Sequence, residues 1–298
     1  MRVLVTGANG LLGNKLMHLL AQHPHIRATA TARKQPAAMP KEIEFEQMDI
    51  TNRANVLDVI ARVKPEVVIH AAAMTQVDQC ETERALCWNT NVHAVESICS
   101  ACQNVNAHLI HVSTDFIFDG TYGPLDETAI PNPVNYYGES KLAGEKLIQQ
   151  SKIDWAILRT VLVYGVTPDM SRSNIVLWVK KSLEEGKSIN VVNDQWRTPT
   201  LAEDLAQGCY LAAIHKAKGI YHIAGSEMMT PFEIAVQTAD FFKLDATLIR
   251  PADSTTFTQP ARRPPKTGFI IAKAQHELGY HPHSFTEGLA LLAEQLHR

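Results

Sequence analysis

The sequence lacks any apolar run of about 18 or more residues, the length needed to cross a bilayer, so no membrane association is expected. It also lacks an excess of charge of one sign: 28 Lys and Arg stand against 31 Asp and Glu, a formal net charge of −3. Because nucleic acid and anionic membranes bind strongly basic surfaces, neither is expected as the main partner. The first residues, MRVLVTGANG, lack the charged head and long apolar core of a secretory signal.

Cysteine is scarce, and the five cysteines are scattered along the chain: Cys80, Cys87, Cys99, Cys102 and Cys209. An odd, scattered set in a chain of this size is typical of reduced thiols in a cytoplasmic protein. Cys99 and Cys102 form a C-x-x-C, but their surroundings predict a helix, and no second cysteine pair or histidine cluster accompanies them. We therefore expect buried helical thiols and predict no metal site.

Hydrophobic residues make up 45% of the chain and charged residues 20%, which suits a folded globular protein. The first half alternates short apolar strands with amphipathic helices, beginning with a strand at 2–6 and a helix at 11–20. Further strands are expected at 27–31, 44–48, 66–70, 108–112 and 155–158. Because parallel strands need helical crossovers, this alternation predicts an α/β fold with a doubly wound parallel sheet of the Rossmann type.

The alternation loosens after Gly165, where helices, short strands and a proline-rich loop follow one another less regularly. At roughly 100–200 residues per domain, a chain of 298 residues suggests two domains. We predict a dinucleotide-binding Rossmann domain over residues 1–167, to which residues 190–225 partly return. Residues 168–298 are predicted to form a smaller, mainly substrate-binding C-terminal domain.

A glycine-rich turn, TGANGLLG, joins the first strand to the first helix with the spacing G-x-x-G-x-x-G. Glycines allow a tight turn and a close approach of the backbone to a pyrophosphate, whose charge lies at the helix N-terminus. The position of the turn, at the first junction of a strand–helix series, favours dinucleotide binding over a simple turn. The residues predicted to bind the cofactor here are Gly7, Asn9, Gly10, Leu11, Leu12 and Gly13.

The end of the second strand indicates which dinucleotide is bound. An NAD site commonly has a carboxylate there for the ribose 2′-OH, whereas this sequence has Arg33 and no acid. A guanidinium can pair with a 2′-phosphate, so NADPH is predicted, with NADH possible; a solvated surface arginine is the alternative. Asp49, beside Ile50 at the end of the third strand, could accept a hydrogen bond from adenine or cap the following turn.

Tyr137 is followed by Lys141 at i+4, which places both side chains on one face of a helix. An ammonium beside a phenol favours the phenolate and lowers its pKa, so the phenol could exchange a proton with a carbonyl oxygen. Thr114 and Asp115 end the fifth strand, at the sheet edge where α/β proteins bind ligands, and we favour Thr114 over Ser113 as the hydroxyl at the site. The alternatives are a surface helix pair and a simple strand cap.

Several segments together carry a family resemblance: TGANGLLG, HAAAMTQVDQCE, STDFIFDG, YGESKLAGE, LRTVLVYG, DQWRTPT and ARRPPKTGF. As a set they resemble the extended short-chain dehydrogenase/reductase family and, within it, the dTDP-4-dehydrorhamnose reductases. The resemblance implies transfer of a hydride from NADPH to the 4-keto carbon of a nucleotide-activated deoxysugar.

The resemblance also implies roles for residues of this sequence. Tyr137 would supply the proton, Lys141 would lower its pKa and hold the nicotinamide ribose, and Thr114 would hydrogen-bond the keto oxygen. The small residues that would let the cofactor lie close to the fourth strand are Ala71, Ala72 and Ala73. The residues expected on the substrate side are Thr75, Asp115, Phe116, Arg262 and Arg263, the two arginines reaching the diphosphate unless they form a solvated loop pair.

Three positions depart from the reductase pattern: Phe116 stands where a tyrosine is common, Leu162 where a tryptophan is common, and Trp196-Arg197 where an aromatic residue and glycine are usual. The exact sugar and nucleotide therefore stay open. A dehydratase would need an Asp-Glu pair, which Asp115-Phe116 does not supply, and an epimerase would usually have an acid near Arg33. A non-catalytic NADP-binding regulatory subunit, as in methionine adenosyltransferase, is disfavoured by the complete Thr114–Tyr137–Lys141 set. A homodimer is the default expectation.

Overall fold

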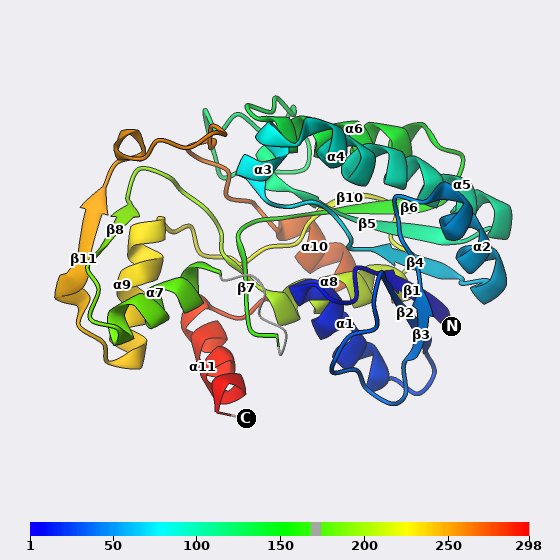
Figure 1. The fold of residues 1–298 in the computed structure, drawn as a ribbon, viewed down its shortest axis with the longest axis horizontal. Helices are drawn as coiled ribbons and strands as arrows, with labels where there is room; N and C mark the ends of the chain where they lie inside the picture. The colour runs from blue at the N-terminus through cyan, green and yellow to red at the C-terminus, as the bar shows by residue number, and fades with distance from the viewer. Residues whose placement is uncertain (168–173, 298) are drawn as a thin grey trace.

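The computed structural model describes residues 1–167 and 174–297. At its centre lies a seven-stranded sheet in the order β10-β6-β5-β4-β1-β2-β3, with every neighbouring pair parallel (Figure 1). The strands are β1 (Arg2–Thr6), β2 (Arg27–Ala32), β3 (Glu44–Gln47), β4 (Val67–His70), β5 (His108–Thr114), β6 (Trp155–Thr160) and β10 (Gly219–His222). The chain reverses direction across the sheet between β1 and β4, and the carboxyl edge at such a switch point is where α/β proteins bind ligands. The predicted doubly wound parallel sheet is confirmed.

Helices cover both faces of this sheet. The helices around it are α1 (Leu11–Ala21), α2 (Arg53–Val63), α5 (Ala94–Val105), α6 (Tyr136–Gln150), α8 (Ala202–Ile214) and α10 (Ala272–Leu278). In β1, Val3 and Val5 pack into the core on the side of Leu16 from α1, whereas Leu4 packs on the opposite side with Ile60 from α2. Burial on both faces explains why the parallel strands are continuous apolar runs.

A second group of elements lies to one side of the sheet, at the left of Figure 1. It contains α7 (Ile175–Glu184), β8 (Ile189–Val192), α9 (Pro231–Phe242), β11 (Ile249–Ala252) and α11 (Phe285–Leu296), with β8 and β11 forming a parallel pair. Val179, Ala235 and Ile249 belong to a core of its own. Short strands β7 (Val163–Tyr164) and β9 (Thr200–Leu201) also pair. The division of the chain at residue 167 stays a prediction.

Strand β10 is at the edge of the sheet, yet two of its outward backbone groups are bound by side chains. Glu127 accepts a hydrogen bond from the His222 amide at 2.9 Å. Lys273, on α10, donates to the Ile220 carbonyl at 2.8 Å. These contacts attach α10 and the loop that holds Glu127 to the sheet.

The helix predicted around Cys99 and Cys102, whose sequence pattern runs over 85–102, is interrupted in the structure. It consists of α4 (Arg84–Trp88), one wide turn η1 (Asn89–His93) and then α5, and a further short helix, α3 (Val77–Thr82), precedes it. The amide of Asn91, inside the wide turn, bonds the backbone of Met74 and the hydroxyl of Ser140. Such wide turns commonly occur near functional sites. All five cysteines are free and buried, and no helix in the described ranges is long and apolar enough to cross a membrane.

Candidate active site

The glycine turn between β1 and α1 is closely packed. Gly7 has a φ of +76°, and a Cβ atom there would lie 2.9 Å from the backbone of Ala72. A Cβ atom on Gly13 would lie 2.2 Å from the carbonyl oxygen of Gly7. Glycine is therefore required at both positions for the turn to close. Gly10 caps α1 without a side-chain hydrogen bond, so the first amides of the helix remain available to an anion.

The ends of β1 and β4 meet beside this turn. Thr6 accepts a hydrogen bond from the Ala72 amide at 3.1 Å, and its hydroxyl lies 2.8 Å from Nδ1 of His70. These contacts place Ala71, Ala72 and Ala73 next to the glycine turn at the switch point of the sheet. Because the three side chains are only methyl groups, a flat ligand could approach the backbone closely.

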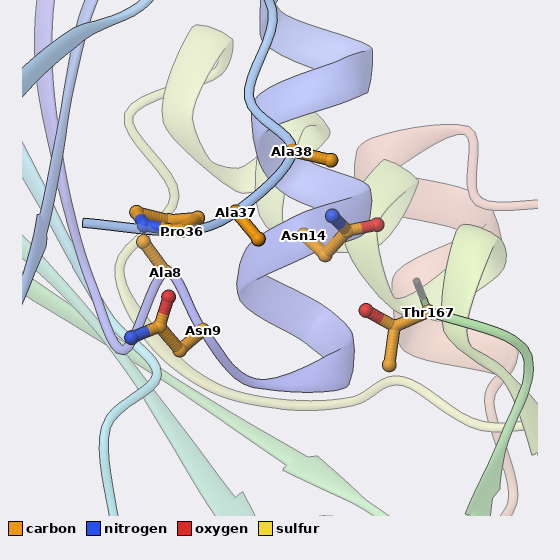
Figure 2. A pocket seen from close by; sticks show the side chains of 7 residues that line it. All are labelled: Ala8, Asn9, Asn14, Pro36, Ala37, Ala38 and Thr167. Atoms are coloured by element: carbon orange, nitrogen blue, oxygen red, sulfur yellow. The ribbon is translucent and has the colours of Figure 1, made fainter. Parts of the chain in front are cut away.

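A small hollow borders the other side of the glycine turn (Figure 2). It is lined by Ala8, Asn9, Asn14, Pro36, Ala37, Ala38 and Thr167. Asn9 donates to the carbonyl of Lys34 at 2.9 Å, which ties the segment after β2 to the turn. The neighbouring Arg33 is exposed, and within the described ranges its guanidinium has no hydrogen-bond or ion-pair partner. Its charge is free to meet a phosphate group.

Three other predicted cofactor residues have structural contacts. The Asp49 carboxylate accepts hydrogen bonds from the amide and hydroxyl of Thr51, at 2.9 and 2.7 Å, so it caps the turn before α2. Ile50 packs against the core on the α2 side of the sheet. Leu12 is partly buried against the core on the α1 side. In the structure Asp49 therefore has the second of its two predicted roles, as the cap of the turn that follows β3.

The residues predicted to transfer the proton come together where β5 and α6 meet. Asn135 caps α6 by accepting a hydrogen bond from the Gly138 amide at 2.8 Å. This cap fixes the start of the helix that carries Tyr137 and Lys141. Tyr137 is buried beside the hydroxyl of Thr114 at the end of β5. The Tyr137 ring also packs edge-on against Phe116, with ring centroids 5.8 Å apart.

Burial controls the ionisation of this pair. It raises the pKa of Tyr137 well above its ordinary value, and the Thr114 hydroxyl only partly opposes the rise. Burial also lowers the pKa of Lys141 to about 8, against the attraction of Glu145. The expected lowering of the Tyr137 pKa by Lys141 is not seen, because desolvation and the nearby Asp115 carboxylate both raise that pKa and Lys141 is not among the groups that shift it. At neutral pH the site holds a protonated phenol and an ammonium.

The Lys141 ammonium points into the protein toward β5. It donates to the Val112 carbonyl at 2.8 Å and lies 3.2 Å from Nε2 of His111. Burial and the nearby ammonium lower the pKa of His111 well below its ordinary value, so the imidazole is neutral and can accept from Lys141. Sequence reasoning missed His111, although its place three residues before Thr114 in β5 was a usable signal.

The predicted substrate-side residues are less closely grouped. Asp115 is buried directly after Thr114, whereas Thr75 lies in the exposed loop after β4. Arg263 forms a two-point ion pair with Asp78, at 2.5 and 2.8 Å, while the Arg262 side chain is exposed. Arg263 thus has a carboxylate partner within the protein, and Arg262 faces solvent. No group of three or more His, Cys, Asp or Glu side chains able to hold a metal occurs in the described part.

The whole length of the chain, residues 1–298, matches the family model described as the RmlD substrate binding domain. The chain belongs to this family. It is 36% identical over 256 residues to methionine adenosyltransferase 2 subunit beta of Xenopus laevis, covering 84% of this chain and 75% of that protein. It is 30% identical over 300 residues to the dTDP-4-dehydrorhamnose reductase of Aggregatibacter actinomycetemcomitans, covering 97% of each.

Solved structures agree with the family assignment. The dTDP-4-dehydrorhamnose reductase of Bacillus anthracis, in complex with NADP, superposes with a TM-score of 0.85 at 29% identity, covering 99% of each chain. This chain is thus homologous in sequence and structure to dTDP-4-dehydrorhamnose reductases, which confirms the resemblance identified in its sequence. The relatives of this chain include named reductases and a named subunit of another enzyme, so two activities are to be considered.

Proposed function

We propose that this RmlD-family protein reduces the 4-keto group of a nucleotide-activated deoxysugar with NADPH, as a dTDP-4-dehydrorhamnose reductase would. The observation that carries the proposal is the burial of the protonated Tyr137 phenol against Thr114, with Lys141 on the same helix. This group lies at the carboxyl edge of the sheet, where β5 stands two strands along from β1 and its glycine turn. The named reductase relatives, which match this chain over almost its full length, support it.

The chain's own residues account for the proton half of the reduction. When bound, NADPH would supply the hydride and leave as NADP⁺. Tyr137 donates its phenolic proton to the keto oxygen, so the carbonyl becomes a secondary alcohol and the phenol becomes a phenolate. Lys141 stays an ammonium at neutral pH because its pKa is about 8, so it can stabilise that phenolate. Buried Met74 and partly buried Phe116 pack around Tyr137 and limit access of water to the phenol.

The cofactor residues support NADPH over NADH. The glycine turn offers free helix amides to a pyrophosphate. Arg33 offers an unpaired guanidinium beside the hollow, where a 2′-phosphate would add a charge-assisted hydrogen bond. NADH would bind without that contact, so we propose it as the weaker cofactor.

Three further expectations remain part of the proposal. The substrate-side residues are Thr75, Asp115, Phe116, Arg262 and Arg263. Reduced thiols and the use of NADPH favour the cytoplasm as the site of the reaction. A homodimer is proposed as the default assembly of an enzyme of this size.

A second candidate function is a nucleotide-binding regulatory subunit. It is favoured by the 36% identity to methionine adenosyltransferase 2 subunit beta, which exceeds the identity to the named reductases. A protein with that role would bind NADPH without turning over a ketone. The complete set of Thr114, Tyr137 and Lys141 favours the reductase.

Turnover separates the two candidates. We expect NADPH absorbance to fall when the protein meets dTDP-4-keto-6-deoxy sugar, and Tyr137→Phe to lower kcat about 100-fold or more, because general acid catalysis is lost. The NADPH dissociation constant should change by less than about threefold, since the phenol contributes mainly to the reaction. Tyr136→Phe is a matched control, because Tyr136 packs under Arg84 instead. Tight NADPH binding without turnover would contradict the proposal.

A further inference from the structure

His111 is a buried histidine in β5, and one of its ring nitrogens faces the Lys141 ammonium. Only 1% of the residue is exposed, and its Nε2 lies 3.2 Å from Nζ of Lys141. The same ammonium donates to the Val112 carbonyl oxygen at 2.8 Å. Both partners belong to β5, so this strand holds the ammonium at two points.

The contact with Lys141 determines which ring nitrogen of His111 carries the proton. An ammonium can only donate hydrogen bonds, so Nε2 of the neutral imidazole must accept. The N–H of His111 is therefore on Nδ1, which is buried without a hydrogen-bond partner in the described part of the chain. Because an unsatisfied buried N–H costs stability, packing alone does not explain a histidine at this position.

A second buried histidine, His70, does not compete with Lys141 for His111. The two rings lie side by side on β4 and β5, with centroids 5.2 Å apart. Nδ1 of His70 lies 2.8 Å from the Thr6 hydroxyl, which already accepts from the Ala72 amide. The Thr6 proton has no other acceptor within residues 1–167 and 174–297, so it goes to Nδ1 and His70 carries its N–H on Nε2. Two N–H groups cannot bond each other, so Nε2 of His111 stays with Lys141.

A neutral acceptor holds the ammonium without cancelling its charge. A carboxylate in place of His111 would form an ion pair with Lys141 and use that charge within the protein. Val112 and His111 take two of the three N–H groups, and the third has no partner among the described residues. Because the first two point to β5, the third points away from that strand.

We infer that His111 is a positioning residue for the proposed reduction: as an uncharged acceptor it directs the Lys141 ammonium and leaves the positive charge and one N–H for the cofactor ribose and the Tyr137 phenolate. The inference rests on the proposed function. It assigns a role to a buried histidine that the i+4 spacing of Tyr137 and Lys141 does not reveal.

Four parts of the chain face the Lys141 ammonium with titratable groups. These are His111 from β5, His70 from β4, Cys87 from α4 and Glu145 from α6. Burial lowers the pKa of both histidines, so they are uncharged, and Glu145 is bound to Arg159. Of the side chains that the structure describes, His111 alone lies within hydrogen-bond distance of the ammonium. Its removal should therefore make Lys141 lose its proton more easily.

The test replaces His111 in the full-length protein with leucine, which removes the acceptor, and with glutamine, whose Oε1 can take the place of Nε2. Wild-type kcat should fall as pH rises through about 8, where Lys141 loses its charge. In His111→Leu, kcat at pH 7 should fall about tenfold, with the KM for the ketone changed by less than about twofold. The alkaline limb should move down by about one pH unit, and His111→Gln should restore the wild-type profile.

His108→Leu is the matched control, because His108 is a buried histidine at the first position of the same strand. It should leave kcat and the alkaline limb as they are in the wild type, whatever stability it loses. The inference is overturned if His111→Leu loses kcat with an unmoved alkaline limb. It is also overturned if His111→Gln or His108→Leu loses as much kcat as His111→Leu.

Imidazole ¹⁵N resonances of the wild-type protein, with His111 assigned from its own backbone, remain decisive if His111→Leu does not fold. Nε2 should have the resonance of an unprotonated, accepting nitrogen and Nδ1 that of an N–H. A proton on Nε2 overturns the inference. Absence of wild-type turnover refutes the proposed function whichever nitrogen carries the proton. Turnover with the expected tautomer, but with an unshifted profile in His111→Leu, refutes the inference alone.

Discussion

Two charged side chains, Lys141 and Glu145, are buried along α6, the helix that carries Tyr137. Glu145, one turn after Lys141, forms a two-point ion pair with Arg159 of β6, at 2.7 and 3.1 Å, with both side chains almost fully buried. Breaking such a pair by removing one partner leaves an uncompensated charge, so this ion pair fixes α6 against the sheet. The buried positive charge of Lys141 is less well compensated, because the ammonium contacts only one carbonyl oxygen and one neutral imidazole and no carboxylate at hydrogen-bond distance in the described residues.

The low pKa of Lys141 predicts a pH-dependent stability. Its pKa is 10.5 in the unfolded chain and about 8 in the folded protein, so between these values the unfolded state binds the extra proton. The free energy of unfolding should therefore rise with pH in this window. Between pH 7 and 9.5, urea unfolding should show the wild type gaining about 2 kcal/mol relative to Lys141→Met.

Lys146→Met is a suitable control, because Lys146 is exposed on the same helix. Its unfolding free energy should follow that of the wild type over this pH range. A difference between wild type and Lys141→Met that does not change with pH would contradict the low pKa of Lys141.

At the scale of single residues, the sequence is sufficient to select the side chains of the candidate site but not to predict their ionisation states. The i+4 spacing was sufficient to select Tyr137 and Lys141, which the structure places on one buried helix face. The direction of the Tyr137 pKa shift was not accessible, since it depends on how many atoms of the folded protein exclude water from the phenol. The contact between Asp115 and Thr267 joins residues 152 positions apart, and local patterns carry no information about it.

The approach of α6 to the end of β5 depends on a glycine within the helix. Gly138 follows Tyr137, and a Cβ atom there would lie 2.1 Å from the carbonyl oxygen of Phe116. The same Cβ would lie 2.9 Å from Pro133. Glycine at this position therefore sets how closely Tyr137 can approach Thr114.

Gly138→Ala should push α6 away from the short turn η2 (Asp115–Ile117). We expect a loss of about 1–3 kcal/mol in unfolding free energy from overpacking. A fall in kcat of at least about tenfold should accompany it, because small displacements of reacting groups are costly. The measurements are urea unfolding and steady-state kinetics.

Gly186→Ala, at the end of α7, is the matched control for this change. Gly186 has a φ of +67° and nothing near its Cβ position, so alanine there costs stability without moving Tyr137. If both variants lost kcat in proportion to stability, the positioning role of Gly138 would be wrong.

Periodicity predicted most elements around the sheet, but not the break before α5. The residues from 85 to 102 have a continuous helical pattern, and the wide turn η1 arises from tertiary contacts of Asn91 with Met74 and Ser140. A single polar residue in a helical pattern does not reveal such partners, because they come from other parts of the chain.

At the scale of the whole molecule, side-chain hydrogen bonds attach segment 261–267 to three residues of the first half of the chain. Asp78 of α3 holds Arg263, and Asn135 at the start of α6 donates to the Arg262 carbonyl at 2.8 Å. Thr267 holds Asp115 at the end of β5. The segment that carries the predicted diphosphate-binding arginines is thus attached beside the site.

Asp78→Asn should weaken the first of these attachments. Because Arg263 and Asp78 are partly exposed, we expect less than about 1 kcal/mol of lost stability. The KM for the nucleotide sugar should rise about threefold or more while NADPH affinity is retained, because only substrate binding uses this segment.

Steady-state kinetics and NADPH titration measure these two effects separately. Asp126→Asn is the control, since the Asp126 side chain bonds Thr128 in its own loop. The charge-reversed pair Asp78→Arg with Arg263→Asp should restore attachment of the segment. An unchanged KM in Asp78→Asn would argue against a role for this attachment in substrate binding.

At the largest scale, strand–helix alternation was sufficient to predict the parallel sheet, because a repeated crossover leaves few other arrangements. The sequence also predicted that residues 190–225 partly return to this domain, but not which strand of the sheet they would join. Nothing local in residues 219–222 marks them as the neighbour of β6, and the pairing is decided by packing of α8 and α10 on the assembled sheet.

The two side-chain contacts on β10 also affect behaviour at high protein concentration. A bare edge strand is a template on which another chain can add by backbone hydrogen bonding, a common start of aggregation. On β10, the Glu127 carboxylate binds the outward amide of His222, and the Lys273 ammonium binds the outward carbonyl of Ile220. An incoming strand would have to displace both, so the open side of the sheet resists uncontrolled self-association.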